Sequence, residues 1–465
     1  MTTSAMLDNT TIEAFADNLG GEVLQPHDAG FDKSVRIWNA AARKQPGLVA
    51  RCRSAVDVAT AVNFARENGL VVAVRGGGHN VAGTATCEGG LMIDLSPMNA
   101  VEVDPQARTA RAGGGATWAD LDAGTQKYGL ATAGGLVSKT GIAGLTLGGG
   151  LGWLRRKHGL SCDNLVAVEI VTADGSILTA SETENVELFW GIRGGGGNFG
   201  VVTTFEYRLH PVGPEVMFAF VLYPTENGRA VLSGWRDFCD NAPDEVCSIT
   251  LCGTVPSEDP FPADIHGRHF IALATVYVGP VAEGERILQP LRELGEPLCD
   301  FSGPMPFVEI QSNFDDDYPD GRRYYWKSLY LERFDDAAID LVLRLTAERP
   351  SDLSTVDVWQ LGGAMGRVAS DATAFGNRRA PWLLGVESNW DDPAADERNR
   401  DWTREACARF APLSTGEAYL NFEPEMVSRS CSDTAREMRL AALKGRYDPG
   451  NLFRLNHNIA PARSP

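Results

Sequence analysis

Four glycine-rich segments before residue 201 constrain the fold of this chain more than any other feature of its sequence. They are residues 75–80 (RGGGHN), 113–115 (GGG), 144–152 (GLTLGGGLG) and 193–200 (RGGGGNFG). Glycine permits positive φ and has no side chain, so several backbone amides can line up against the phosphates of a ligand. One such segment is typical of a tight turn. Four in one half of the chain predict a site for a phosphate-containing ligand.

Two common phosphate-binding motifs fit the sequence poorly. Residues 195–200 match G-x-G-x-x-G, but that fingerprint should follow a strand, open a helix and precede an acidic residue by roughly twenty positions. The following VVTTFEYRL is strand-like, and Glu206 comes too soon. Residues 75–80 lack the lysine of a P-loop. A nicotinamide dinucleotide site and a nucleoside triphosphate site are therefore both disfavoured.

The charge balance disfavours nucleic acid and anionic membranes as partners. The chain has 42 basic and 61 acidic residues, a formal net charge of −19. Such a surface repels phosphate groups. It suits a protein that acts on neutral or cationic small molecules.

The N-terminus and the cysteines predict a cytoplasmic protein. The first residues, MTTSAMLDNTTIEAF, lack the basic and apolar regions of a signal peptide, and no run of about 20 apolar residues predicts a membrane span. The nine cysteines are odd in number and form no CxxC pair. We expect buried reduced thiols, with no disulfide framework and no metal site.

The pattern of elements predicts an α+β protein of two or three domains. Strands near 47–50, 71–74 and 91–95, with a helix after Ser54, form a small α/β unit. Antiparallel strands follow from about Val101, including a hairpin at Asp174-Gly175. Beyond about residue 211, segments such as HFIALATVYV and RYYWKSLYLERF alternate with helices and predict an antiparallel sheet. The last segment is too short for its own core and is expected to pack onto the first domain.

The motif RGGGHNVAG introduces a resemblance that runs along nearly the whole chain. With GLMIDLSPMNAVEVD, GLTLGGGLGWLRRKHGLSCDNL, LFWGIRGGGGNFGVVTTFEYRL and YDPGNLFRLNHNI, the chain resembles the FAD-linked oxidases of the vanillyl-alcohol oxidase superfamily, specifically the berberine-bridge-enzyme-like group. The resemblance implies a PCMH-type FAD-binding domain of two α/β subdomains, formed by residues 1–210 and completed by residues 413–465. Residues 211–412 are then the substrate-binding domain, whose helix-covered antiparallel sheet roofs the isoalloxazine.

The resemblance also implies a covalent flavin. In this family the histidine of RGGGH bonds to the 8α carbon of the flavin, and His79 matches it. An imidazole nitrogen is a good nucleophile at neutral pH, and a glycine loop lets it approach closely. Many relatives carry a second bond to a cysteine, but Val137 stands at that position, in GLVSKTGIAG, and valine cannot form a thioether. We therefore expect FAD with a single histidyl link and no cysteinyl link.

Further positions match those at which the family contacts FAD. For two of them another role stays open: Arg75 as a cation that stabilises the fold, and Asn421 as a hydrogen-bond partner of the backbone instead of the flavin. The matching residues are Arg75, Gly76, Gly77, Gly78, Asn80, Gly83, Gly134, Gly135, Thr140, Gly141, Gly144, Gly148, Gly149, Gly152, Asp163, Asn164, Gly200, Val202, Asn421, Asn456 and Asn458.

The implied chemistry is hydride transfer from a C–H bond next to oxygen or nitrogen to flavin N5, with the protein orienting the substrate. An alcohol also has to lose its hydroxyl proton, whereas an amine need only arrive unprotonated. The leading candidate to assist is Tyr419, in the family's Y-x-N-[YF] motif. Lys327, Gln360 and Glu387 on the predicted roof strands are weaker candidates, because alternation puts Lys327 and Trp326 on opposite faces without showing which face meets the flavin.

The expected function is thus FAD-dependent oxidation of a small-molecule substrate, with molecular oxygen as the acceptor. Two alternatives stay open: a dehydrogenase that uses another acceptor, and a flavin-holding protein without turnover. The sequence leaves the substrate and the oligomeric state open, because specificity depends on side chains of the roof sheet.

Overall fold

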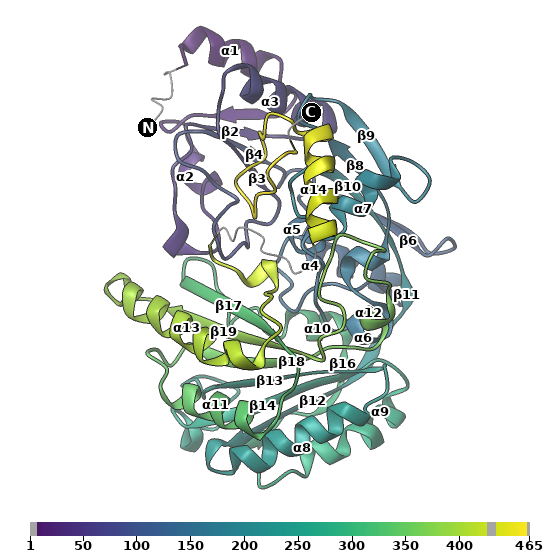
Figure 1. The fold of residues 1–465 in the computed structure, drawn as a ribbon, viewed down its shortest axis with the longest axis vertical. Helices are drawn as coiled ribbons and strands as arrows, with labels where there is room; N and C mark the ends of the chain where they lie inside the picture. The colour runs from purple at the N-terminus through teal and green to yellow at the C-terminus, as the bar shows by residue number, and fades with distance from the viewer. Residues whose placement is uncertain (1–6, 426–433, 463–465) are drawn as a thin grey trace.

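The computed structural model describes residues 7–425 and 434–462, and its sheets fall into two regions that lie one above the other in Figure 1. The upper region contains a four-stranded, a five-stranded and a two-stranded sheet. The lower region holds one eight-stranded sheet with helices on its outer face. This mixture of helices with parallel and antiparallel strands confirms the predicted α+β fold class.

The four-stranded sheet is the predicted α/β unit at the start of the chain. Its order is β1 (Glu22–Leu24), β2 (Leu48–Arg51), β4 (Leu91–Asp94) and β3 (Val72–Arg75). β2 and β3 pair parallel with β4, and β1 pairs antiparallel with β2. The crossover helix α3 (Ala55–Glu67) begins after Ser54, whose hydroxyl accepts a hydrogen bond from the Asp57 amide. Helices α1 (Asn9–Asp17) and α2 (Phe31–Ser34) precede it.

The five-stranded sheet is antiparallel throughout. Its order is β5 (Val101–Asp104), β6 (Thr109–Gly113), β10 (Val201–Arg208), β8 (Leu165–Val171) and β9 (Ile177–Ser181). Gly175, at φ 82°, makes the predicted turn between β8 and β9. The connecting elements are α4 (Trp118–Thr125), β7 (Leu130–Ala131), α5 (Ile142–Leu147), α6 (Arg155–His158), α7 (Val186–Ile192) and β11 (His210–Pro211), which pairs with β7.

The eight-stranded sheet follows β11, and all its pairs are antiparallel. Its order is β15 (Cys299–Asp300), β12 (Glu215–Pro224), β14 (His269–Tyr277), β13 (Val246–Thr254), β18 (Thr355–Gln360), β19 (Trp382–Trp390) and β17 (Arg323–Leu331), with β16 (Gly303–Pro306) also on β12. Its helices are α8 (Gly228–Asn241), α9 (Val281–Leu288), α10 (Phe307–Ser312), α11 (Asp336–Ala347), α12 (Ala364–Arg367) and α13 (Asp396–Phe410).

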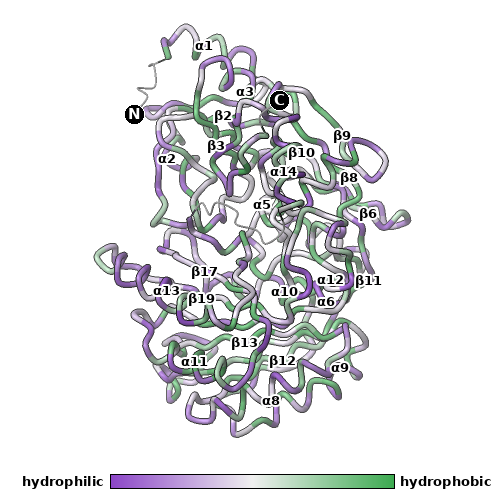
Figure 2. Tube along the Cα trace, in the orientation of Figure 1, coloured by the Kyte–Doolittle hydropathy of each residue, from purple (hydrophilic) through white to green (hydrophobic). Residues whose placement is uncertain are grey.

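Strand alternation gives the two faces of this sheet different partners. Val358 and Val386 pack against apolar side chains of α8, α11 and α13. Trp359 and Leu383, on the opposite face, belong to a second core that includes side chains of the upper region. In Figure 2 the strands of the sheet carry much green, whereas α13 is largely purple. One face is therefore a helix-covered core, and the other is a roof over the upper region.

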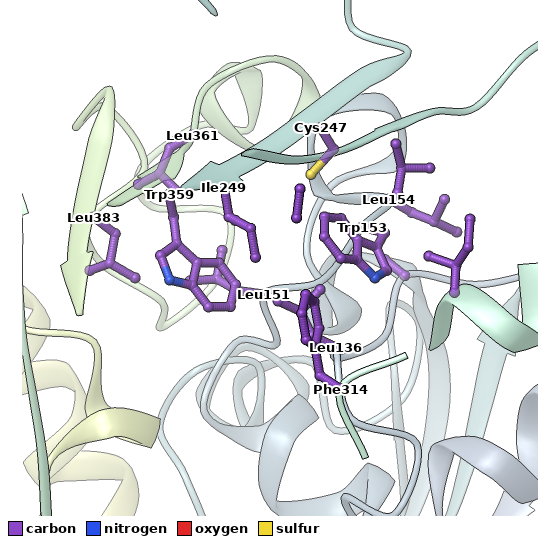
Figure 3. Close-up of a cluster of buried hydrophobic side chains, with 14 of the residues drawn as sticks. Leu136, Leu151, Trp153, Leu154, Cys247, Ile249, Phe314, Trp359, Leu361 and Leu383 are labelled. Carbon is purple, nitrogen blue, oxygen red and sulfur yellow. The ribbon is translucent and has the colours of Figure 1, made fainter. Parts of the chain in front are cut away.

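Apolar side chains from both regions meet beneath this roof (Figure 3). The upper region contributes Leu136, Leu151 and Trp153, and the sheet contributes Ile249, Trp359 and Leu383. Several of these side chains also line the cavity described below. The roof and the loops below it thus form one packed unit.

Two buried arginines of α6 fasten the upper region to the roof. Arg155 donates hydrogen bonds to the Gln360 and Ser248 carbonyls over 2.9 and 3.0 Å. Arg156 donates to the Val246 carbonyl over 2.8 Å. Since a buried guanidinium without acceptors is costly, these bonds fix the height of the roof above the loops.

The C-terminal segment returns to the upper region. Helix α14 (Thr434–Tyr447) lies beside α7, and in Figure 1 it runs in yellow next to the blue strands. Buried Lys444 pairs with Asp448 over 2.6 Å and donates to the Asn198 carbonyl over 2.7 Å. No helix within residues 7–425 and 434–462 has the length and apolar character needed to cross a membrane.

Candidate active site

A long cavity separates the glycine-rich loops from the roof. Its floor and sides come from the loop after β3, from α5 and the loops flanking it, from the segment before β10 and from residues near the C-terminus. Its top comes from β13, β17, β18 and β19. Of the predicted site residues, it is lined by Gly76, Gly77, Gly78, His79, Asn80, Thr140, Gly141, Gly144, Gly148, Gly200, Val202, Glu387, Tyr419, Asn421 and Asn456.

Two of the glycine loops cross in direct backbone contact. A Cβ placed on Gly77 would lie 2.4 Å from the Gly141 nitrogen, and one placed on Gly141 would lie 2.3 Å from the Gly77 nitrogen. Only glycine permits this approach. The crossing holds residues 76–80 against the start of α5, at the wall of the cavity.

Other cavity glycines face open space. A Cβ on Gly144 would meet no atom within 4 Å, and one on Gly197 would meet only Asn456 Nδ2, at 3.8 Å. Neither glycine is buried, since Gly144 is exposed and Gly197 is half-buried. The open side of these glycines is therefore where a bound molecule could lie close to the main chain.

This contrast predicts opposite effects for two alanine substitutions. Gly77→Ala should destabilise the protein by at least about 1–3 kcal/mol, because its methyl group collides with backbone. Gly144→Ala should leave the cofactor-free protein as stable or up to about 1 kcal/mol more stable, since it lies within α5, yet it should weaken cofactor retention. Thermal unfolding and flavin content measure the two effects. Equal loss of stability in both variants would contradict this assignment.

His79 points an unpaired nitrogen into buried space. Its ring is stacked on Trp38 with centroids 4.1 Å apart, and Trp38 is in turn stacked on Tyr324 at 3.6 Å. His79 Nε2 is buried and has no hydrogen-bond partner among the described residues. Burial, with a smaller effect of the charge on Lys139, lowers the pKa of His79 to about 3. The imidazole is therefore neutral and nucleophilic at neutral pH.

These features fit FAD. Its diphosphate needs backbone amides, which the glycine loops provide, and its ring system needs a flat, partly apolar cavity. A second buried atom without a described partner, Asn456 Oδ1, belongs to a cavity residue whose amide donates to the Gly197 carbonyl over 3.0 Å. Orphaned polar atoms together with glycine backbone open to the cavity are expected where a polar ligand completes the site.

Tyr419 lies within a network of its own. Its hydroxyl accepts hydrogen bonds from the Leu151 amide over 3.2 Å and from Asn421 Nδ2 over 2.8 Å. Asn421 also donates to the Leu145 carbonyl over 3.1 Å. Burial raises the pKa of Tyr419 to about 12. The phenol thus keeps its proton at neutral pH and is suited to donate a hydrogen bond to a ligand.

Two buried carboxyl groups face the cavity from the roof. Asp357 on β18 and Glu387 on β19 are each 2% exposed. A Cβ on Gly385, the register partner of Asp357, would lie 3.5 Å from Glu387 Oε1 and 3.7 Å from Asp357 Cβ, so both side chains flank this glycine. Tyr318 donates a hydrogen bond to Glu387 Oε2 over 2.8 Å. Burial raises the pKa of Glu387 to about 7; burial and the charge of Glu387 raise that of Asp357.

Several predicted glycines lie outside the cavity lining and serve close packing. A Cβ on Gly83 would lie 2.3 Å from Ala42 Cβ, and one on Gly134 would lie 2.7 Å from the Trp118 ring. The same role is filled by Gly135 against Leu145, Gly149 against Phe375 and Gly152 against the Gly134 carbonyl.

Four polar positions that match the family's flavin contacts also lie outside the cavity lining. The Asn164 amide donates to the His158 and Leu160 carbonyls, and its oxygen contacts His210 Nε2 over 2.7 Å. Asp163 forms a buried ion pair with Arg378 over 2.7 Å. Arg75 donates to the Ser34 carbonyl over 2.5 Å, and Asn458 Oδ1 is buried without a described partner.

Lys327 and Gln360 also lie outside the cavity. Lys327 pairs with Glu423 over 3.0 Å, while its strand neighbour Trp326 faces the cavity. Gln360 donates to the Cys239 carbonyl over 2.8 Å, while its neighbour Trp359 lines the cavity. Strand alternation therefore turns both predicted side chains away from the site.

Four further cavity or ring-stacking residues belong to none of the motifs: Trp38, Tyr318, Trp326 and Asp357. Asp357 carries the clearest signal, because a carboxylate in TVDVWQ interrupts an otherwise largely apolar strand. Tyr318 lies in the segment between α10 and β17, where no periodicity exists to mark it.

Comparisons with known proteins agree with this site. A family profile described as an FAD binding domain matches residues 46–181, and one described as "Berberine and berberine like" matches residues 437–460. The (R)-6-hydroxynicotine oxidase of Paenarthrobacter nicotinovorans is 32% identical over 469 residues, which cover 96% of this chain and 98% of that protein. An FAD-linked oxidoreductase of Dictyostelium discoideum is 29% identical, over 97% of both chains.

Solved structures share the fold. The 6-hydroxy-D-nicotine oxidase of Arthrobacter nicotinovorans superposes with a TM-score of 0.86 at 29% identity, covering 96% of this chain and 98% of the other. A berberine-bridge-enzyme-like protein of Physcomitrella patens has the same TM-score at 21% identity, covering 98% and 100%. Fold and site together define an FAD-dependent oxidoreductase. The chain belongs to the berberine-bridge-enzyme-like family of FAD-linked oxidoreductases.

Proposed function

We propose that this enzyme is an oxidase that holds FAD through a single covalent bond to His79 and oxidises a small alcohol or amine, with oxygen as the electron acceptor. The observation that carries the proposal is the neutral, buried and unpaired Nε2 of His79 among the glycine loops. Val137 lines the same cavity, and its side chain offers no sulfur for a second bond.

The residues proposed to hold FAD are those that line the cavity. Backbone of residues 76–80 and 140–148 would bind the diphosphate and ribityl groups, while Asn421 and Asn456 would bind polar edges of the ring. We also propose that residues 1–210 and 413–465 form the FAD-binding domain and that residues 211–412 form the substrate-binding domain. The return of α14 to α7 supports this division.

Bound FAD would supply the redox step, accepting a hydride from the substrate and passing electrons to oxygen. The protein must orient the substrate and take up its proton. Glu387 is the better proton acceptor, because its pKa of about 7 lies near working pH, whereas that of Tyr419 is about 12. We assign Tyr419 the role of donating a hydrogen bond that orients the ligand.

A substrate panel with flavin absorbance as the readout tests this function. We expect at least one small alcohol or amine to bleach the purified yellow protein under anaerobic conditions, and colour to return within seconds of admitting air. Slow recovery in air with rapid recovery on adding a dye would favour the dehydrogenase alternative. A protein that no donor bleaches would favour the flavin-holding alternative.

We retain a cytoplasmic location as part of the proposal. All eight cysteines within the described residues are free thiols, and seven of them are buried. Fractionation of the native cells, with the covalent flavin followed by its fluorescence, tests the location.

A further inference from the structure

The roof of the cavity holds two buried carboxyl groups, Asp357 and Glu387, that have no described counterion. Among residues 7–425 and 434–462, no lysine, arginine or histidine forms an ion pair with Asp357 or Glu387. Arg349 lies near enough to act on Asp357 electrostatically, but its guanidinium donates instead to the Thr346 carbonyl and the Thr254 hydroxyl. Asp357 Oδ1 is buried and has no hydrogen-bond partner in the described part of the chain. Burying such a carboxyl costs free energy unless a partner satisfies it.

The same part of the cavity is lined by aromatic rings. Trp326 lies edge-on to Tyr318 at 5.3 Å and to Phe422 at 5.5 Å between centroids. All three line the cavity with Asp357 and Glu387. The faces of aromatic rings attract organic cations, most strongly where water is excluded. Carboxyl groups and aromatic rings together favour an organic ammonium over a neutral alcohol.

A chain of contacts connects this pocket to the proposed attachment point. His79 is stacked on Trp38, and Trp38 meets Trp326 at 5.1 Å between centroids. Trp326 then contacts Tyr318, whose hydroxyl binds Glu387. Packed aromatic rings therefore connect His79 to Glu387 on the roof of the cavity.

We infer that the substrate is an organic amine that enters as its ammonium ion and is bound between Asp357, Glu387 and the ring of Trp326. The inference rests on the proposed oxidase function and names its substrate class. A metal ion fits less well, because the described residues contain no cluster of three or more metal-ligating side chains.

The carboxyl pair also suits the chemistry of an amine. Glu387 accepts the ammonium proton, becoming a neutral carboxyl, and the nitrogen regains its lone pair. When the neighbouring C–H bond breaks, its electron pair leaves with the hydrogen as hydride to FAD, and the nitrogen becomes an iminium cation. Asp357 lies beside that cation, and a neighbouring positive charge favours the ionised form of a carboxyl group, which then stabilises the developing iminium. An alcohol, which ends as a neutral carbonyl, gains less from this charge.

Three probes of one shape test the inference on the holoenzyme: benzylamine, benzyl alcohol and benzyltrimethylammonium, a permanent cation. Binding is followed by tryptophan fluorescence, which does not require turnover, and by flavin absorbance. At a pH where benzylamine is protonated, we expect both cations to bind about tenfold or more tightly than the alcohol. Asp357→Asn should remove most of that difference while changing the affinity for benzyl alcohol little.

Asp122→Asn is the matched control. Asp122 is also buried with a raised pKa, but it lies on α4, bonded to Gln311 outside the cavity, so its removal should leave the preference for cations intact. Equal affinity of the wild-type protein for cation and alcohol would overturn the inference without any variant. The inference would also be overturned if the Asp357→Asn variant and the Glu387→Gln variant each still bound the cations more tightly than benzyl alcohol.

Failure of this inference is distinguishable from failure of the oxidase proposal. Bleaching by alcohols without binding of either cation would reject amine recognition and leave the oxidase function standing. Tight cation binding to a protein whose flavin no donor bleaches would support amine recognition and reject the oxidase function.

Discussion

Replacing His79 with alanine should give a protein whose acid-precipitated pellet is colourless, with all flavin in the supernatant, whereas the wild-type pellet stays yellow. The reason is that Nε2 of His79 is the buried, neutral nucleophile among the glycine loops. The native variant should still hold some FAD, because the backbone contacts of the glycine loops are unchanged. Absorbance and fluorescence of the pellet measure the outcome directly.

A second histidine provides the control for this experiment. His269 is exposed at the start of β14, so His269→Ala should keep the flavin in the pellet. A yellow pellet from His79→Ala would show that another side chain forms the bond. Loss of colour from both variants would point to a general failure of flavin incorporation.

Local signals in the sequence were sufficient to predict several elements of the upper region. Ser54 caps α3 as predicted, and Asp174-Gly175 turns β8 into β9. Both depend on the conformational preferences of a few adjacent residues, which act largely independently of the rest of the fold.

The facing of the roof strands could not be predicted in the same way. Alternation separates Trp326 from Lys327, but it does not show which of them meets the cavity. That choice depends on the packing of α8, α11 and α13 against one face of the sheet. Of these helices only α11 follows β17 directly, whereas α8 and α13 are far from it in sequence, so no pattern within β17 itself encodes the choice.

The same limit explains which site residues were predicted. The glycines and His79 lie in contiguous motifs, whereas Trp38, Tyr318 and Asp357 converge from separate segments.

Motif matches also include residues whose polar groups already have partners within the protein. Asn164 bonds to two carbonyls and to His210, so its position in the motif reflects folding of the loop. Resemblance locates a motif, and only the hydrogen-bond partners show which of its members are left for a ligand.

Glu387→Gln should slow flavin reduction by about a hundredfold or more with the best donor of the panel, because glutamine cannot accept the substrate proton. A proton acceptor works only when deprotonated, and burial raises the pKa of Glu387 from its usual value to about 7. The wild-type rate should therefore rise as pH increases through about 7 and then level off, since the carboxylate form replaces the carboxyl form over that range. The Glu387→Gln variant should lose this inflection. Anaerobic stopped-flow measurement of bleaching across pH tests both effects.

Tyr419→Phe distinguishes Glu387 from the other candidate. Removing the Tyr419 hydroxyl leaves the Leu151 amide without this acceptor and takes one of two acceptors from Asn421, which still donates to the Leu145 carbonyl. We therefore expect weaker substrate orientation and a smaller loss of rate. The inflection near pH 7 should persist in this variant, because Glu387 is unchanged. If Tyr419→Phe abolishes the inflection while Glu387→Gln retains it, the phenol is the proton acceptor, and the binding of FAD must then lower its pKa far below the value of about 12 that burial imposes.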